Sequence, residues 1–265
     1  MVDLGLTGKV ALVVAASKGM GRASAMGFGA EGARVAMCAR GEADLRAAAD
    51  DVSKQTGADV LAVAADANKP EDIARVVAKT REKWGGVDVL VANVGGPPPG
   101  PFEQTTDEQW KAAFEQVHLS TVRFIRAVLP DMKQKKWGRI LAIQSSSVKQ
   151  PVEGLVLSNG IRPGIAGMFK TLANELGRDG ITVNMVLPGR IRTDRFLGHQ
   201  KDLATRAGKS LEEWIATRST ADIPMGRIGT PEEFANMVVF LASERASYMT
   251  GCVVQVDGGL IKSVV

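Results

Sequence analysis

The stretch VALVVAASKGMGR, from Val10 to Arg22, joins an apolar run to a glycine-rich turn. The first five residues are apolar and rich in valine, which is typical of a strand covered on both faces in a parallel sheet. Gly19 and Gly21 follow where a helical pattern opens, and glycines there let backbone N–H groups approach a phosphate. This order of strand, glycine turn and helix predicts a nucleotide-binding βαβ unit.

The same alternation continues along the rest of the chain. The expected strands are Val10–Ala15, Arg34–Ala39, Val60–Ala64, Val87–Ala92, Arg139–Ile143, Thr182–Leu187 and Val253–Val256. The expected helices are at about Met20–Glu31, Glu42–Thr56, Pro70–Trp84, Asp107–Met132, Gly164–Leu176 and Pro231–Leu241. Strands alternating with helices predict an α/β class, a three-layer doubly wound Rossmann fold with a seven-stranded parallel sheet. We find no linker or repeat, so residues 1–265 are expected to form a single domain.

Two segments interrupt the alternation. Residues Gly95 to Pro101 hold four prolines and three glycines, which excludes a helix or a central strand and predicts a stiff loop. Residues 191–225 are a polar, partly helical insertion after the sixth strand. Both segments are expected at the carboxyl edge of the sheet, where ligands of such folds bind. We interpret them as walls and a lid of a substrate pocket.

Composition narrows the classes of function. The net charge of +4 over 265 residues is too small to indicate nucleic-acid binding, and no apolar run approaches the length of a membrane span. The two cysteines lie in apolar runs and predict free thiols, and two histidines far apart predict no metal site. The N-terminus lacks a signal layout, so a cytoplasmic protein is expected.

Several motifs, taken in order, resemble those of the short-chain dehydrogenase/reductase family over nearly the whole chain. The glycine-rich loop of that family aligns on Ala15 to Gly21, with Ala16 in place of its first glycine. Further matches are Asp66 at the end of the third strand, A-N-V-G at Ala92–Gly95, P-G-R-I-R-T at Pro188–Thr193, and Thr250-Gly251 with V-D-G-G at Val256–Gly259. The resemblance is to the branch of 3-oxoacyl reductases.

The resemblance implies an NADP(H) site. Its expected residues are Ala15, Ser17, Lys18, Gly19, Met20, Gly21, Arg40, Asp66, Ala67, Asn93, Gly95, Arg162, Pro188, Gly189, Ile191 and Thr193. An acid after the second strand would bind the adenine ribose 2′-hydroxyl and repel a 2′-phosphate, whereas this chain has Arg40 there. Lys18 adds a second cation, so NADPH is expected rather than NADH. The alternative is that both cations are merely solvated.

The catalytic pattern of the family is altered. A typical member uses an asparagine, a serine, a tyrosine and a lysine, and the resemblance places the serine on Ser145. Ser158 stands at the tyrosine position, Arg162 at the lysine position and His118 at the asparagine position. The single tyrosine, Tyr248, lies in a C-terminal segment interpreted as a packing position.

These replacements change the proton chemistry. A serine hydroxyl is a far weaker acid than a phenol, whose pKa is about 10, and it is shorter. Arg162 can anchor ribose hydroxyls, but a pKa above about 12 makes it a poor proton donor. His118, with a free pKa of about 6.5, suits acid–base work, although it could equally brace its helix. Lys149 and an ordered water are further candidates for the proton source.

Three functions follow from this sequence. The first is an NADPH-dependent reductase that converts the carbonyl of a small molecule to an alcohol with a non-standard proton donor. The second is a non-redox lyase or isomerase on the same fold, and the third is a catalytically silent nucleotide-binding subunit. The resemblance also implies a homo-oligomer, either a dimer or a tetramer.

Overall fold

The computed structural model describes residues 3–264 and centres on one parallel sheet. Its strands are β1 (Val10–Val14), β2 (Arg34–Ala39), β3 (Val60–Ala64), β4 (Val89–Asn93), β5 (Gly138–Ile143), β6 (Ile181–Pro188) and β7 (Val253–Val256). They lie in the order β3-β2-β1-β4-β5-β6-β7, and every neighbouring pair is parallel. The order reverses between β1 and β4, so a ligand crevice is expected at their carboxyl ends. The predicted doubly wound fold is confirmed.

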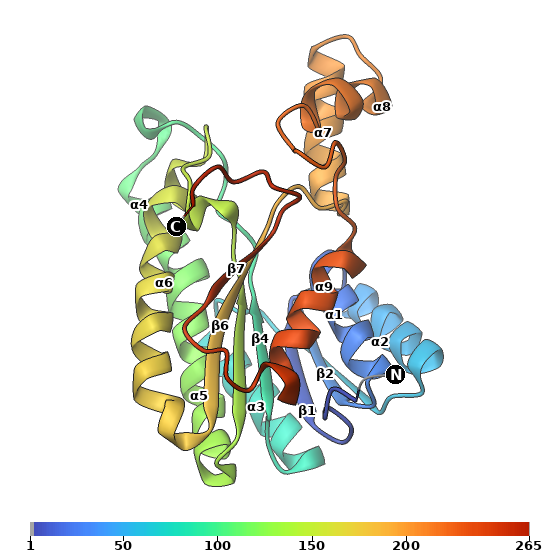
Figure 1. Ribbon diagram of the computed structural model, residues 1–265, viewed down its shortest axis with the longest axis vertical. Helices are drawn as coiled ribbons and strands as arrows, with labels where there is room; N and C mark the ends of the chain where they lie inside the picture. The colour runs from blue at the N-terminus through green and yellow to red at the C-terminus, as the bar shows by residue number, and fades with distance from the viewer. Residues whose placement is uncertain (1–2, 265) are drawn as a thin grey trace.

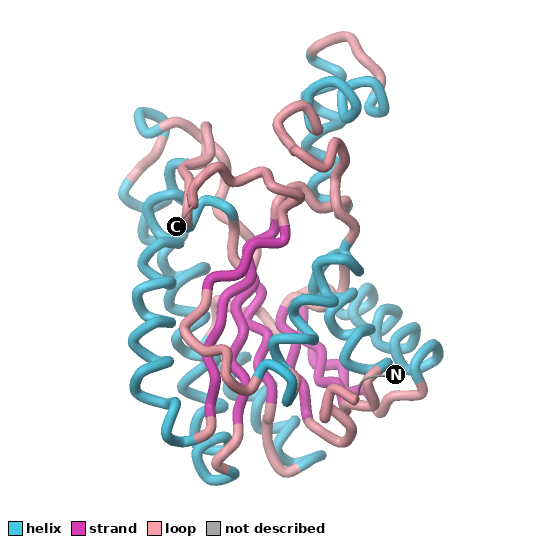
Figure 2. The backbone as a smooth tube through the Cα atoms, viewed as in Figure 1, coloured by secondary structure: helices cyan, strands magenta, loops and turns pink. Residues whose placement is uncertain are grey.

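Helices cover both faces of the sheet, as Figures 1 and 2 show. One face carries α1 (Gly19–Ala30), α2 (Glu42–Thr56) and α9 (Pro231–Ala242), and the other carries α3 (Pro70–Trp84), α5 (Ser120–Lys135) and α6 (Val156–Leu176). Phe28 and Phe234 fill the first interface and Phe124 the second, all of them fully buried. Two apolar layers around one sheet give the scaffold its rigidity.

Two helices differ from their predicted bounds. The helix expected over 107–132 consists of α4 (Asp107–Phe114), a π-helical turn (Glu115–Leu119) and α5. The helix expected from Gly164 begins earlier, at Val156, and Pro163 lies inside it. Asn159 fastens this extra length, since its side chain makes two hydrogen bonds with the backbone of Val152, of 3.0 and 2.8 Å. Residues 158 and 162 therefore share one helical face.

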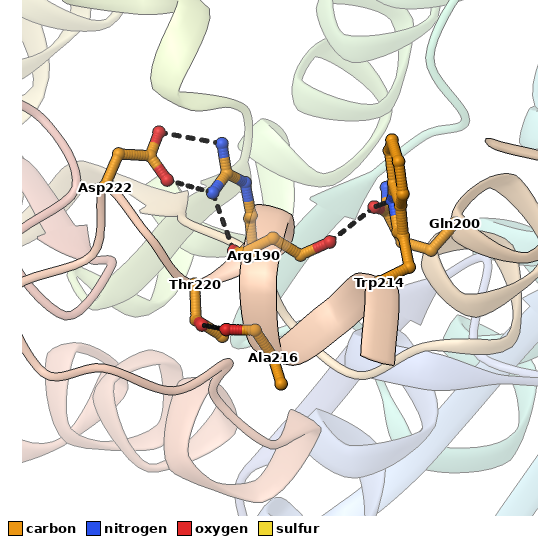
Figure 3. A network of polar contacts seen from close by, with 7 residues as sticks. Arg190, Gln200, Trp214, Ala216, Thr220 and Asp222 are labelled. Atoms are coloured by element: carbon orange, nitrogen blue, oxygen red, sulfur yellow. Dashed lines mark hydrogen bonds and ion pairs between the residues drawn. The ribbon is translucent and has the colours of Figure 1, made fainter. Parts of the chain in front are cut away.

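The insertion at 191–225 folds into α7 (Asp194–Arg206), α8 (Leu211–Trp214) and a π-helical turn (Ile215–Ser219). These elements stand above the carboxyl edge of the sheet in Figure 1. Figure 3 shows two contacts that give the insertion its shape. Gln200 Oε1 accepts a hydrogen bond from Trp214 Nε1 at 3.0 Å, and Arg190, just after β6, forms a bidentate ion pair with Asp222.

No helix within residues 3–264 has both the length and the apolar character needed to cross a bilayer.

Candidate active site

The glycine-rich loop between β1 and α1 forms a backbone cradle. Ala15 has a φ of +52°, in the left-handed region that favours glycine, whereas Ala16 is a fully buried core residue. The family's first glycine therefore corresponds to Ala15 and not, as expected from the sequence, to Ala16. Left-handed backbone at an alanine carries strain, which is tolerated where the surrounding structure fixes it.

Gly19 and Gly21 let the loop pack closely against neighbouring residues of the chain. A Cβ on Gly21 would lie 2.4 Å from the Ala15 carbonyl oxygen and 2.8 Å from Asn93 Nδ2. Gly19 has a φ of +56° and faces Thr193, whose methyl group would be 3.1 Å from an added Cβ. Helix α1 begins at Gly19 without a side-chain cap or an acidic residue in its first turn. Its free N–H groups suit a phosphate.

A side cavity of about 260 Å³ opens beside this loop, between the ends of β2 and β3. The predicted residues Ser17, Arg40, Asp66, Ala67, Asn93 and Gly95 line it. Arg40 is exposed at its rim. Asn68, which the sequence analysis missed, also lines the cavity, and its buried Oδ1 has no hydrogen-bond partner in the described chain. A buried acceptor without a partner in the chain is open to a donor from a water or from a ligand.

Lys18 is less free than expected. Its ammonium group forms an ion pair with Asp44 on α2, at 2.8 Å, and this contact raises the pKa of Lys18. Both side chains are exposed, so the pair contributes little to stability. Asp44 offsets the positive charge of Lys18, whereas no ion pair is formed by Arg40 within residues 3–264.

A central cavity of about 570 Å³ lies at the carboxyl ends of β1, β4, β5 and β6 and shares Ala15, Asn93 and Gly95 with the side cavity. The predicted residues on its wall are Ala15, Lys18, Gly19, Met20, Asn93, Gly95, Ser145, Ser158, Arg162, Pro188, Gly189 and Thr193. Ile191 lies apart from it, buried in the core, and Gly21 acts from beneath the loop.

The catalytic positions form a buried polar network on one wall of the central cavity. Arg162 donates a hydrogen bond from Nε to Ser158 Oγ at 3.0 Å, one helical turn back on α6. Ser158 Oγ lies 2.9 Å from the hydroxyl of Ser147, and the Ser147 backbone N–H donates to Ser145 Oγ at 3.2 Å. The network thus connects the positions of the family's serine, tyrosine and lysine.

Gln144 extends this network and was not foreseen from the sequence. Its Oε1 accepts a hydrogen bond of 2.6 Å from Arg162 Nη1, while its buried Nε2 has no partner among the described residues. Arg162 is 5% exposed, and burial, with the nearby charge of Arg195, lowers its pKa to about 10. The guanidinium is therefore still cationic at neutral pH, but it is a stronger acid than a free arginine.

His118 does not reach either cavity. Its ring stacks on Phe114, with the centroids 4.9 Å apart, and lies beside Gly164 of α6. Burial lowers the pKa of His118, so the ring is neutral at pH 7. Lys149 also lies off the walls of both cavities. Tyr248 is fully exposed, which corrects its interpretation as a packing position.

Comparisons with known proteins agree with this architecture. The family model described as enoyl-(acyl carrier protein) reductase matches residues 14–261. The 3-oxoacyl-(acyl-carrier-protein) reductase FabG of Escherichia coli is 36% identical over 253 residues, which are 96% of this chain and 97% of the relative.

Two solved structures superpose closely. L-sorbose reductase from Gluconobacter frateurii, complexed with NADPH and L-sorbose, has a TM-score of 0.96 at 35% identity and covers 99% of this chain and 100% of its own. Actinorhodin polyketide ketoreductase with NADPH has a TM-score of 0.91 at 34% identity, over 97% and 98% of the two chains. With its sheet order, its glycine-rich cradle and matches over nearly its whole length, the chain belongs to the short-chain dehydrogenase/reductase family.

Proposed function

We propose that this protein is an NADPH-dependent oxidoreductase that reduces the carbonyl group of a small molecule to an alcohol, with Ser158 and Arg162 in place of the usual tyrosine and lysine. One observation carries the proposal. The central cavity brings the glycine-rich cradle and the hydrogen-bonded pair Ser158–Arg162 to the same edge of the sheet. Relatives that support it are an L-sorbose reductase and a polyketide ketoreductase, each with NADPH.

The residues of both cavities fit the cofactor. The N-terminus of α1, which begins at Gly19 without a side-chain cap, would hold the pyrophosphate, and the two glycines let the loop keep the close packing that this cradle needs. Asn68 would receive a donor of the adenine ring, and Arg40 would face the 2′-phosphate. Arg162 stands where the family's lysine would bind the hydroxyls of the nicotinamide ribose, but its Nε and Nη1 are engaged with Ser158 and Gln144, so in this chain it acts on Ser158 instead. When bound, NADPH supplies the hydride that reduces the carbonyl carbon.

Proton donation to the carbonyl oxygen must differ from that of typical family members, because this chain lacks their tyrosine. Because Arg162 Nε already donates to Ser158 Oγ, the Ser158 proton is left for Ser147 or for a substrate oxygen. Its transfer to the carbonyl oxygen completes the alcohol, and the positive charge of Arg162 stabilises the serine oxygen that remains. Water entering the cavity returns the proton. Ser145 contributes a second hydroxyl that orients the carbonyl.

The rest of the cavity wall selects the substrate. Pro97, Val152, Leu155 and Phe196 give it apolar patches, and Phe196 comes from α7 of the insertion. We assign the insertion at 191–225 the role of a lid, because its first helix contributes directly to the wall above Ser158.

The test is NADPH oxidation by the purified protein with aldehydes, ketones and 3-oxoacyl thioesters, while cofactor binding is measured separately by fluorescence. The expected result is steady turnover that depends on substrate and is faster with NADPH than with NADH. Tight binding of NADPH without oxidation on any carbonyl compound would reject the proposal in favour of a silent subunit. Substrate conversion without a change in the cofactor would favour a lyase or an isomerase.

A further inference from the structure

Two guanidinium groups from different parts of the chain meet over the loop that follows β4. Arg162 reaches this point from α6, and Arg195 reaches it from the first turn of α7. A Cβ on Gly96 would lie 3.4 Å from Arg162 Nη2 and 3.3 Å from Arg195 Nη2, so the two guanidinium groups approach the same point on this loop. Arg195 Nη2 also donates to the Gly96 carbonyl oxygen at 3.3 Å, which ties the lid to the loop.

Neither of these arginines has a carboxylate partner within residues 3–264. The other two basic side chains on the wall that carry a full charge are neutralised, because Lys18 pairs with Asp44 and Arg190 pairs with Asp222. The only acidic side chain lining the described cavity, Asp194, forms no ion pair with Arg162 or Arg195. Two like charges held close together, one of them buried, are unfavourable unless an anion joins them.

The hydrogen-bonding donors show what kind of anion would fit. Arg162 donates from Nε to Ser158 and from Nη1 to Gln144, and its Nη2 has no hydrogen-bond partner among residues 3–264. Arg195 donates from Nη2 to the Gly96 carbonyl oxygen, and its Nη1 remains to bind a ligand. The two remaining nitrogens face the same part of the cavity, beside Gly96. Two donors on two guanidiniums match the two oxygens of a carboxylate.

We propose that Arg162 and Arg195 form a carboxylate site and that the natural substrate is an oxo acid. The inference rests on the proposed reductase function and specifies its substrate class. Arg162 Nε lies 3.0 Å from Ser158 Oγ, and Nη2 belongs to the same guanidinium. A carboxylate on Nη2 therefore places a carbonyl one or two carbons away beside the Ser158 hydroxyl, as in a 2-oxo or a 3-oxo acid.

The first test compares oxo acids with their own methyl esters, for example 2-oxobutanoate and acetoacetate, as substrates for NADPH oxidation. The acid is expected to have the higher kcat/KM. Arg195→Gln should raise KM for the acid by about 10- to 100-fold, the value of a lost charged hydrogen bond, with kcat and the ester kinetics little changed. Arg206→Gln, an exposed arginine at the end of the same helix, is the matched control and should behave as the parent.

A binding measurement decides the question without turnover. Malonate, in the presence of NADPH, should raise the melting temperature of the parent protein and of Arg206→Gln but not that of Arg195→Gln. Stabilisation by inorganic phosphate and not by malonate, or equal rates on acids and esters, would overturn the carboxylate site.

The cofactor offers a different anion for the same arginines, so its affinity is measured as well. The dissociation constant of NADPH, from fluorescence titration, should be unchanged in Arg195→Gln. A weaker affinity for NADPH with an unchanged KM for the acid would assign Arg195 to the pyrophosphate and overturn the proposal. If no carbonyl compound is reduced but malonate still stabilises the protein through Arg195, the carboxylate site stands and the reductase function fails.

Discussion

The nucleotide end and the catalytic end of the cavity follow the family pattern to different degrees. At the nucleotide end, Gly19 and Gly21 are retained, and the one departure, Ala15, still adopts the left-handed backbone of the glycine it replaces. At the catalytic end, Ser158 and Arg162 replace the phenol and the ammonium, and Gln144 joins them in a buried network. The residues of the nucleotide end must all fit one cofactor. The residues of the catalytic end can differ between proteins that bind different substrates and use different proton donors.

The largest effect is expected from Ser158→Ala, which tests whether the catalytic end works as proposed. Removal of a general acid costs about 10²- to 10⁴-fold in rate, so kcat should fall by about a hundredfold or more. Ser147→Ala removes only the neighbouring hydroxyl at 2.9 Å and should cost less. Steady-state kinetics with intact NADPH affinity would separate the two; equal kcat for Ser158→Ala and the parent would contradict a role in proton transfer.

Gly21→Ala tests the nucleotide end. The added Cβ would overlap the Ala15 carbonyl oxygen at 2.4 Å and displace the cradle. Overpacking costs about 1–3 kcal/mol, and if that cost falls on the bound state NADPH affinity drops by roughly 5- to 150-fold. Fluorescence titration measures the change. The control is Gly167→Ala on α6, where an added Cβ meets nothing within 4 Å. An unaltered affinity for NADPH in Gly21→Ala would place the cofactor elsewhere.

The choice of cofactor gives a smaller effect. Arg40→Ala should weaken NADPH about tenfold and leave NADH unchanged, because only NADPH carries the 2′-phosphate. Lys18→Ala should weaken NADPH less, since Asp44 already offsets its charge at 2.8 Å. Parallel titrations with the two cofactors provide the comparison. An equal loss of affinity for NADPH and NADH would mean that neither Arg40 nor Lys18 binds the 2′-phosphate.

The smallest effect is expected from His118→Asn. Burial lowers the pKa of His118, so its protonated form is lost below pH 6.5 as the pH rises. If His118 were the proton donor, activity would fall through that range and the fall would vanish in the variant. Because the ring stacks on Phe114 outside both cavities, kcat should change by less than about twofold and the pH profile should keep its shape.

The sequence predicted the sheet well, because valine-rich runs and glycine turns report local burial and local backbone shape. The prediction failed where the start of a helix depends on contacts with residues outside it. The helix expected from Gly164 begins at Val156, where the side chain of Asn159 is hydrogen-bonded to the backbone of Val152. Ala16 was taken for the glycine position, whereas the left-handed backbone lies at Ala15, four residues before Gly19.

The site shows the same division. Ser145, Ser158 and Arg162 were expected from the family resemblance, whose catalytic residues follow one another in a short segment. Gln144 and Asn68 were missed, because nothing near them in the chain marks a buried amide without a partner. Arg195 was missed because its neighbours in space come from distant parts of the chain. The contact between Arg195 and Gly96 joins residues 99 positions apart, and it exists only once the lid and the β4 loop have folded together.

The most direct test of the account is the transfer of deuterium from NADPH labelled on the nicotinamide ring to a carbonyl substrate, followed by mass spectrometry of the product. The account predicts an alcohol with one deuterium on the former carbonyl carbon, formed by the parent protein and about a hundredfold more slowly by Ser158→Ala. Bound NADPH that keeps its deuterium with every oxo acid, ketone and aldehyde would contradict it.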